Sequence, residues 1–432
     1  MIEMNKAKYV RFGKFILMLI IISVLVGVGS GLLAFLLEFI EYIALGFIES
    51  AHYPAAYNTS ALRRFLSVSI ALSLAGVIWY FLRNKTQKVP SVSQAVKGEQ
   101  MPTWQTIVHV CTQIGIVGAG ASIGRETSPR ELGSLIAQKV CKLFSNQHLN
   151  IQNFSTGNIV ALAASAGLAA VYDAPFAGMF FAVEILLKTR NIALIFSSSC
   201  MSFIAAYIAG LMRGTDVYYE MPYITKGFAI DYQIIVFAII AGVICGVVGW
   251  VFRHCFKMAQ VKQVRNSSIF ITMPMVGVLS GVLAYFMPQI MGNGRAAAQL
   301  ALLVPDNSMY QNMWRILLIT LIAKMLITLV TIHAGASGGV IQPAIASGAI
   351  IGLLLGGLWC MLSLPQVNFT MCALIGAVAF LAASQQAALM SLSLVIELTH
   401  APLILVIPAV IAAIIALQFS KIITSYYNKK QI

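Results

Sequence analysis

Charged residues are scarce in this sequence. Only 10% of the 432 residues are Asp, Glu, Lys or Arg, while 59% are hydrophobic, and the mean hydropathy is +0.87. Soluble globular domains have about 25% charged residues. The scarcity of charge therefore excludes an ordinary soluble domain and predicts a protein embedded in a lipid bilayer.

The chain also lacks the cysteine and histidine patterns of metal sites. Its seven cysteines contain no C-x-x-C pair, and its six histidines form no H-x-x-x-H or H-E-x-x-H pattern. Zinc sites need such spacings. We therefore predict packing roles for the cysteines, no metal ion, and a protein that is not an enzyme.

We attribute the net charge of +14 to Lys and Arg residues that mark the cytoplasmic side of a membrane protein. Lys and Arg residues cluster in short segments between apolar runs and not on one soluble basic face, so we expect no nucleic acid partner. Basic flanks accumulate on the cytoplasmic side of membrane proteins. Arg11 and Lys14 precede the first apolar run, and Lys421 and Lys429 follow the last. Both termini are therefore predicted to be cytoplasmic in a bacterial inner membrane.

Long apolar runs make up most of the chain. The first extends from Lys14 to Glu38 without a charge, a stretch of 23 residues. This is enough to cross a hydrocarbon core of about 30 Å and too long for a cleaved signal peptide. No segment is polar and long enough for a second, soluble domain, so residues 1–432 are predicted to form one transmembrane domain. The apolar segments lie near 15–40, 62–82, 104–120, 156–187, 192–212, 231–252, 270–289, 315–333, 338–362, 370–384 and 388–420.

The two halves of the sequence resemble each other, with repeat halves at approximately 14–215 and 230–425. The connection 42–62 contains Glu49 and no Lys or Arg, whereas the equivalent connection after the second-half segment is basic. Equivalent loops therefore face opposite sides, which predicts an inverted repeat with a substrate site between its halves. Matching residues at an offset of 215 are Gly27, Gly31, Ala119–Ser122, Gly124 and Gly133 with Gly242, Gly246, Ala334–Ser337, Gly339 and Gly348.

Two glycine-rich segments are the candidate ligand-binding segments of the sequence. Residues 118–126 (GAGASIGRE) end one apolar run and open another, and residues 334–343 (AGASGGVIQP) do the same without a charge. Backbone N–H groups at a helix start and the positive end of the helix dipole favour an anion. A dinucleotide-binding loop would need a preceding strand in a soluble βαβ unit, and that context is missing. We predict that the two helix starts converge on one anion site.

These motifs resemble those of the CLC family of chloride channels and chloride/proton exchangers, in the bacterial type without cytoplasmic CBS domains. Gly124-Arg125-Glu126 resembles the GREGP motif, Gly339–Pro343 resembles GxFxP, and residues 90–98 resemble GSGIPE. The resemblance implies an all-α polytopic membrane protein with the CLC-type fold, in which two inverted-topology repeats have broken helices that meet at midplane. It also implies a homodimer that moves chloride or a similar small anion.

The resemblance implies a role for individual residues. Glu126 is the gate, whose carboxylate must be protonated or swung aside for an anion to pass. Tyr426 is the tyrosine whose hydroxyl is expected to contact the anion. Tyr427 is the alternative, since only the spacing from a preceding Gln-Phe pair decides between them. Bound chloride is expected and no cofactor. The residues expected to bind the anion are Ser91, Gly124, Arg125, Val340, Ile341 and Tyr426.

Departures from the family motifs bear on the mode of transport. Thr127-Ser128 replaces Gly-Pro, and Ile341 replaces a phenylalanine. In residues 173–185, which resemble NAPLAGxxFxxEE, Ile185 occupies the place of the internal proton acceptor of exchangers. An aliphatic side chain cannot carry a proton. We therefore favour a passive gated channel, with a chloride/proton antiporter as the alternative because Glu126 remains. A cation-coupled organic-solute transporter is a remote alternative that inverted repeats also permit.

Overall fold

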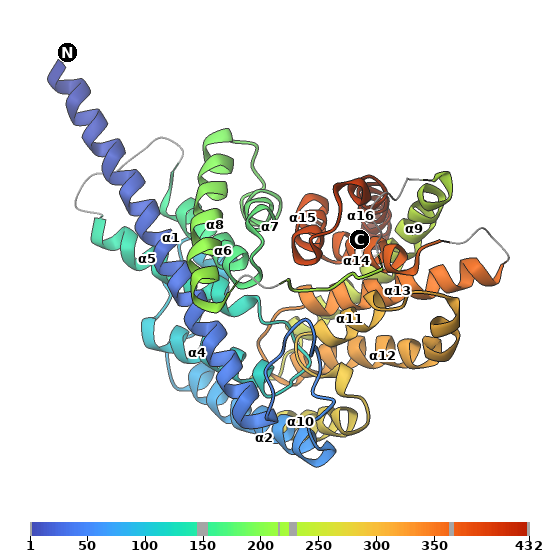
Figure 1. Ribbon diagram of the computed structural model, residues 1–432. Coiled ribbons are helices and arrows are strands. Elements are labelled where there is room, and N and C mark those ends of the chain that lie inside the picture. The colour runs from blue at the N-terminus through green and yellow to red at the C-terminus, as the bar shows by residue number, and fades with distance from the viewer. Residues whose placement is uncertain (1, 145–153, 215–216, 224–230, 363–366, 430–432) are drawn as a thin grey trace. The chain divides into compact units, whose positions relative to one another are not determined.

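The structure is a computed structural model that describes residues 2–144, 154–214, 217–223, 231–362 and 367–429, with side chains from Tyr9 onwards. Over these residues the chain is almost entirely helical (Figure 1). The α-helices of the described part are α1 (Ile2–Leu45), α2 (Ala61–Asn84), α3 (Val92–Val96), α4 (Thr103–Gly118), α5 (Thr127–Phe144), α6 (Thr156–Tyr172), α7 (Pro175–Phe180), α8 (Ile192–Arg213), α9 (Tyr232–Val261), α10 (Ile269–Phe286), α11 (Arg295–Leu302), α12 (Asn307–Ala334), α13 (Ile341–Met361), α14 (Phe369–Gln385), α15 (Ala388–Thr399) and α16 (Val406–Lys429). A π-helix, η2 (Phe181–Leu186), continues α7, and the 3₁₀ turns η3 (Pro288–Ile290) and η4 (Leu403–Leu405) precede α11 and α16.

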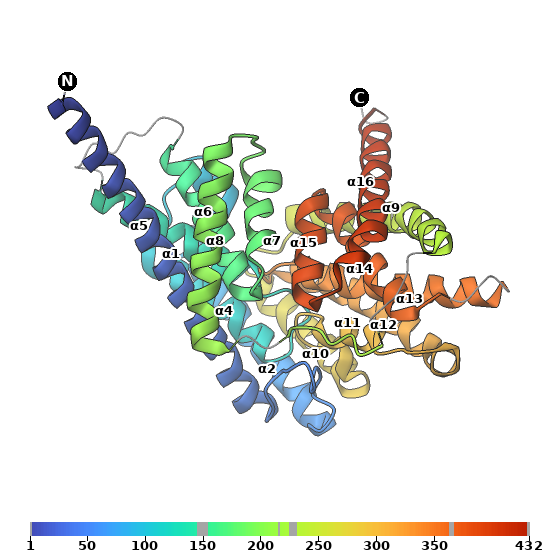
Figure 2. The ribbon, with the colours of Figure 1, turned by 45° about the horizontal axis from the view of Figure 1, so that its top comes forward.

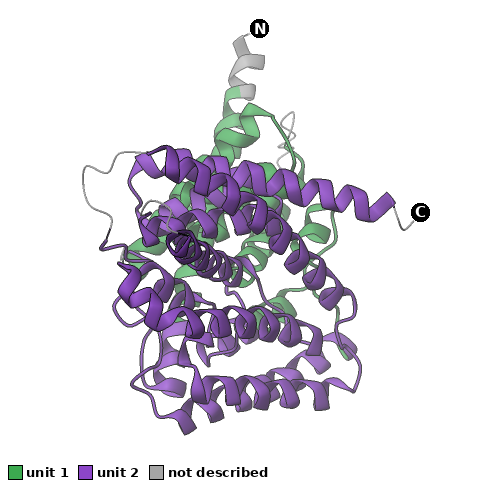
Figure 3. Ribbon diagram, turned by 90° about the vertical axis from the view of Figure 1, so that its right-hand side faces the viewer, with its two compact units in different colours: residues 1–36, 85–111, 126–215 green, residues 37–84, 112–125, 216–432 purple. Residues whose placement is uncertain are grey.

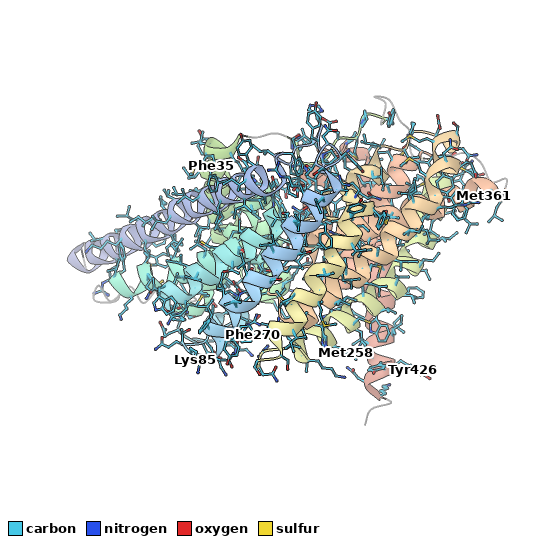
Figure 4. All side chains as sticks on the ribbon, turned by 90° about the horizontal axis from the view of Figure 1, so that it is seen from below. Phe35, Lys85, Met258, Phe270, Met361 and Tyr426 are labelled. Atoms are coloured by element: carbon cyan, nitrogen blue, oxygen red, sulfur yellow. The ribbon has the colours of Figure 1, made fainter. Side chains whose placement is uncertain are left out.

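Eight of the described helical segments are long and apolar enough to cross a membrane. A helix satisfies all its interior backbone hydrogen bonds within itself, which is why it suits a bilayer. Large apolar side chains on these helices are exposed, including Phe35, Phe270 and Met361, which Figure 4 labels. Such surfaces are stable when lipid covers them. The segments are Tyr9–Leu45, Ala61–Asn84, Ile192–Arg213, Tyr232–Val261, Ile269–Phe286, Asn307–Ala334, Ile341–Met361 and Leu403–Lys429.

The chain forms two compact units, which we describe separately (Figure 3). Unit 1 comprises residues 1–36, 85–111 and 126–215, and unit 2 comprises residues 37–84, 112–125 and 216–432. The predicted repeat halves, 14–215 and 230–425, divide the chain differently and stay a prediction.

In unit 1, α6 packs against both α5 and α8 (Figure 2). Glycines let the α5 and α6 backbones touch. A methyl group at Gly133 would lie 2.5 Å from the carbonyl oxygen of Ala163, and one at Gly167 would overlap the carbonyl of Pro129. Small residues permit this close approach between helices in membranes. This close contact therefore fixes the position of α5 along α6.

In unit 2, the main helix pairs are α2 with α10, α9 with α16, and α13 with α14. The α13–α14 pair again depends on glycine. A methyl group at Gly348 would lie 2.5 Å from the carbonyl oxygen of Gly376, and one at Gly352 would overlap the carbonyl of Cys372. These two helices meet backbone to backbone.

Two apolar segments of the sequence, 156–187 and 388–420, are each split into two helical pieces. Asp173 (φ 53°) ends α6, and His400 (φ 48°) ends α15. Both adopt the left-handed conformation, and a proline follows each two positions later. Gln386 (φ 60°) lies 213 positions after Asp173, and His400 lies 212 positions after Lys188 (φ 49°). The helix breaks thus recur at nearly the same spacing as the repeat motifs.

Candidate functional site

The two glycine-rich segments meet in unit 2. The Gly124 N–H donates to the carbonyl oxygen of Gly339 (2.7 Å), and the Gly339 N–H donates to that of Gly124 (2.9 Å). Four residues before each of them, Gly120 (φ 102°) and Gly335 (φ 132°) adopt the left-handed conformation, which costs glycine little. Because the Gly124 N–H is used in this bridge, it can bind an anion only if the bridge opens.

The start of α13 is buried and polar. Val340 caps the helix and Ile341 is its first residue, with 6% and 2% of their surfaces exposed. The Gln342 side chain is fully buried, and its Oε1 accepts a hydrogen bond from the Tyr219 hydroxyl (2.6 Å). Its Nε2 has no hydrogen-bond partner within the described part of the chain. A buried donor without a partner beside the positive end of a helix suits an acceptor or an anion.

The starts of α5 and α13 are alike although their sequences differ. Pro129, displaced by one position from the family motif, is the third residue of α5, as Pro343 is of α13. A proline is tolerated in the first turn, because the N–H that it lacks would have no partner within the helix. The displacement therefore leaves the helix start intact. The two starts lie in different units, so their convergence stays a prediction.

Glu126 lies just before α5 in unit 1, and its side chain is fully buried. Its Oε2 accepts a hydrogen bond from the hydroxyl of Tyr172 (3.0 Å), the last residue of α6. The Arg130 guanidinium attracts Glu126 electrostatically and lies over the ring of Phe181, 4.4 Å from its centroid. A buried carboxylate is tolerated only with partners of this kind.

Arg125 belongs to a cluster of charges in unit 2. Its guanidinium lies 5.3 Å from the ring centroid of Tyr218, and that of Arg295 lies 4.2 Å from the same centroid. The Arg295 Nε is 3.8 Å from Glu49 Oε1, and the Glu49 N–H donates to Glu41 Oε2 (2.9 Å). Burial raises the pKa of Tyr218 to about 12, so its ring stays neutral at physiological pH. Arg295 is thus paired with Glu49, and both guanidinium groups lie against the neutral face of Tyr218.

Lys324 is a fully buried ionisable residue that the sequence analysis missed. Its Nζ donates to the carbonyl oxygens of Ile290 (2.9 Å) and Gly292 (2.7 Å). The Gly292 N–H in turn donates to the carbonyl oxygen of Gly120 (2.9 Å). A lysine within the apolar run 315–333 was the available signal, because an ionisable residue in a membrane helix is usually functional.

The hydroxyl-bearing residues predicted to bind the anion lie apart along the chain. Ser91 in unit 1 is exposed and caps α3, donating through its hydroxyl to Gln94 Oε1 (2.8 Å). Tyr426 lies near the end of α16 in unit 2 with 62% of its surface exposed (Figure 4). Its neighbour Tyr427 packs edge-on against Trp250. The roles predicted for Ser91 and for either tyrosine stay predictions.

Ile185, which the sequence motif predicts to stand in the place of a proton acceptor, lies in η2 and is half-buried, as is Glu184 beside it. A π-helical turn within a helix frequently marks a functional site. Among the residues that the structure describes, no three His, Cys, Asp or Glu side chains are arranged to hold a metal ion.

Membrane-length helices, glycine-lined helix starts and buried ionisable groups together define a polytopic membrane transport protein. The sequence model of the family described as "Voltage gated chloride channel" matches residues 70–421. The H(+)/Cl(-) exchange transporter ClcA of Vibrio cholerae serotype O1 (strain M66-2) is 26% identical over 428 residues, which cover 93% of this chain and 86% of the relative. The voltage-gated ClC-type chloride channel ClcB of Escherichia coli O81 (strain ED1a) is 27% identical over 375 residues, which cover 83% and 84%.

Among solved structures, a slow cyanobacterial Cl⁻/H⁺ antiporter matches this chain with a TM-score of 0.76 at 19% identity, covering 94% of this chain and 95% of that one. The chain therefore belongs to the voltage-gated chloride channel family, the CLC family of anion transport proteins. It is an integral membrane protein with the all-α CLC-type fold. The family and the fold class predicted from the sequence are confirmed.

Proposed function

We propose that this chain is a chloride/proton antiporter in which Glu126 serves both as the anion gate and as the proton carrier. The observation that carries this proposal is the complete burial of the Glu126 carboxylate, because an ionisable group inside a membrane protein is usually functional and can take up a proton. Support also comes from the relatives, since ClcA is named an H(+)/Cl(-) exchange transporter. The proposal thus takes the mode that the sequence analysis held as its alternative.

In this mechanism the gate couples the two ions through charge. The ionised carboxylate competes with the transported anion for the positive potential of helix starts. When Glu126 takes up a proton, its charge disappears and an anion can take its place. The ionised carboxylate and the anion therefore exclude each other, and this exclusion couples proton movement in one direction to anion movement in the other. No covalent bond is made or broken, so the protein is a transporter and not an enzyme.

The anion is held mainly by the start of α13. Backbone N–H groups near Val340 and Ile341, the dipole of a 21-residue helix and the unpartnered Nε2 of Gln342 all favour negative charge there. These groups replace the water that a chloride ion loses on entering the membrane. The other predicted contributors are Ser91, Gly124, Arg125 and Tyr426 or Tyr427.

The cellular setting is proposed from the charge pattern and the family resemblance. The protein functions as a homodimer in a bacterial inner membrane, with an anion pathway in each subunit and both termini in the cytoplasm. Arg11 and Lys14 before the first span, and Lys421 and Lys429 after the last, support this orientation.

A measurement on purified protein in liposomes tests the mode. With a tenfold chloride gradient and no proton gradient, we expect chloride to drive protons uphill, and Glu126→Gln to abolish this movement. Chloride flux without proton movement, with a reversal potential near the Nernst value for chloride, would overturn the exchange mechanism.

That second outcome describes the other candidate, a passive gated channel. It is favoured by Ile185, which cannot accept a proton at the place where an exchanger of this family has a carboxylate. The relative ClcB is named a chloride channel. Under this alternative Glu126 would still gate the anion, but without moving protons.

A further inference from the structure

Tyr172 contacts the Glu126 carboxylate in unit 1 through its phenol group. Its hydroxyl lies 3.0 Å from Glu126 Oε2, and only 2% of the tyrosine surface is exposed. Both partners are therefore out of contact with bulk water in unit 1. The sequence motifs gave no role to Tyr172, which directly precedes the segment 173–185.

The backbone positions of the two residues are fixed relative to each other. Glu126 precedes α5 and Tyr172 ends α6, and the two helices touch through Gly133 and Gly167 without intervening side chains. The end of α6 is also held by Arg213 of α8, whose Nη1 donates to the carbonyl oxygen of Val171 (2.6 Å). The packing of α5 on α6 thus fixes the position from which the Tyr172 hydroxyl reaches Glu126.

Several charges surround this pair. Arg130 and Glu131 lie on α5, Asp173 follows Tyr172 at the end of α6, and Arg213 reaches it from α8. Arg130 interacts electrostatically with both Glu126 and Tyr172. Against this background Tyr172 supplies a neutral donor, and a hydrogen bond from a neutral donor to an ionised carboxylate is roughly twice as strong as one between neutral groups.

We propose that Tyr172 is a positioning residue for the gate. The Tyr172 hydroxyl donates a hydrogen bond to the ionised Glu126 carboxylate, and this bond breaks when Glu126 is protonated. This inference rests on the proposed role of Glu126 as the gate. This hydrogen bond favours the ionised form of Glu126. Without the hydroxyl, Glu126 would be protonated, and the gate would open, at a higher pH. A phenylalanine at this position would keep the ring and the packing and lose only this control.

The test compares the rate of chloride efflux from liposomes, as a function of pH, for the wild type, Tyr172→Phe, Glu126→Gln and the double variant. In Tyr172→Phe we expect the midpoint of the pH dependence to move to higher pH by about one unit, that is, about tenfold in proton concentration. Glu126→Gln should remove the pH dependence, and adding Tyr172→Phe to it should change nothing further.

A matched control is Tyr310→Phe. Tyr310 is also buried, and its hydroxyl donates to the carbonyl oxygen of Leu354 (3.4 Å) in unit 2. This variant should keep the wild-type midpoint. Tyr172→Leu provides a second variant without the hydroxyl, should Tyr172→Phe not fold, and its midpoint must move in the same direction.

The outcomes separate the inference from the proposed function. If Glu126→Gln removes the pH dependence but Tyr172→Phe and Tyr172→Leu retain the wild-type midpoint, or move it to lower pH, Tyr172 does not position the gate. If Tyr172→Phe changes the rate of chloride efflux equally with and without the Glu126 carboxylate, its effect is structural. If Glu126→Gln keeps the wild-type pH dependence, the gate assignment itself is wrong and the role of Tyr172 fails with it.

Discussion

Gly124 and Gly339, which are 215 positions apart, each donate their backbone N–H to the carbonyl oxygen of the other. They are equivalent members of the two glycine-rich motifs. An antiparallel bridge between equivalent residues is the contact expected where two repeats of opposite direction meet. The bridge also joins the segment that leads to Glu126 to the segment that leads to α13. Substitutions on either side of it should therefore affect transport in distinguishable ways.

The first prediction concerns Glu126. Glu126→Gln and Glu126→Ala should give a folded protein in which anion flux no longer depends strongly on pH, because the gate is permanently neutral or absent. Flux from liposomes, measured between about pH 4 and pH 8, the range in which most protein carboxylates lose their protons, checks this. Glu184→Gln, which neutralises a half-buried carboxylate of the same unit, should retain the wild-type pH dependence. If the anion flux of Glu126→Gln depends on pH as that of the wild type does, Glu126 is not the gate.

The second prediction concerns the hydroxyl groups that we expect to bind the anion. Ser91→Ala and Tyr426→Phe should each weaken chloride binding, because a hydrogen bond to a buried charge contributes about 1.5–3 kcal/mol. Calorimetric titration with chloride measures the change. Tyr427→Phe is the comparison, and it should leave binding unchanged. The reverse result for the two tyrosines would assign the anion contact to Tyr427, and no change in any variant would contradict the assignment of both residues.

The third prediction concerns the missing proton acceptor. Ile185→Glu places a carboxylate in η2, where the family's exchangers carry one, so more protons should move for each chloride ion. Simultaneous recording of proton and chloride flux measures this ratio. Ile185→Gln is the control, since it is polar but cannot carry a proton in this pH range. An equal ratio in both variants would show that the proton route does not pass position 185.

The fourth prediction concerns Lys324. Lys324→Met keeps the length of the side chain but leaves the carbonyl groups of Ile290 and Gly292 without their buried donor. Unsatisfied buried groups cost about 1–3 kcal/mol each, so the loss of the donor to two carbonyl groups should lower the free energy of unfolding by about 2–6 kcal/mol and the melting temperature should drop. Thermal unfolding in detergent checks this. Lys421→Met, at an exposed position, should melt like the wild type, and a Lys324→Met protein that does so too would contradict a structural role.

The fold class was predictable because it is encoded locally. Apolar runs of membrane length, and glycines such as Gly124 and Gly339 at equal spacing, are visible without any structure. The helix breaks at Asp173 and His400 were not predictable, because neither is a glycine. Asp and His adopt a left-handed backbone more often than most other residues but far less often than glycine, so the residue type alone does not predict a helix break there.

The candidate site was predictable only where a motif marks it. Glu126 stands in a recognisable motif, whereas its partner Tyr172 is 46 positions away and reaches it only through the packing of α5 on α6. Arg295 likewise meets Glu49, 246 positions earlier in the chain, through the tertiary fold. Contacts of this kind follow from three-dimensional arrangement, and one sequence by itself does not contain them.

Helices that meet backbone to backbone cannot slide past each other by small steps, because any shift drives carbonyl oxygens into collision or opens an empty gap. α13 and α14 meet in this way at Gly348, Gly352 and Gly376. The helix start that we propose for the anion is therefore part of a stiff pair. We expect alternating access in this chain to come from rotation of single side chains, and not from the rocking of helix bundles that other transporter folds use.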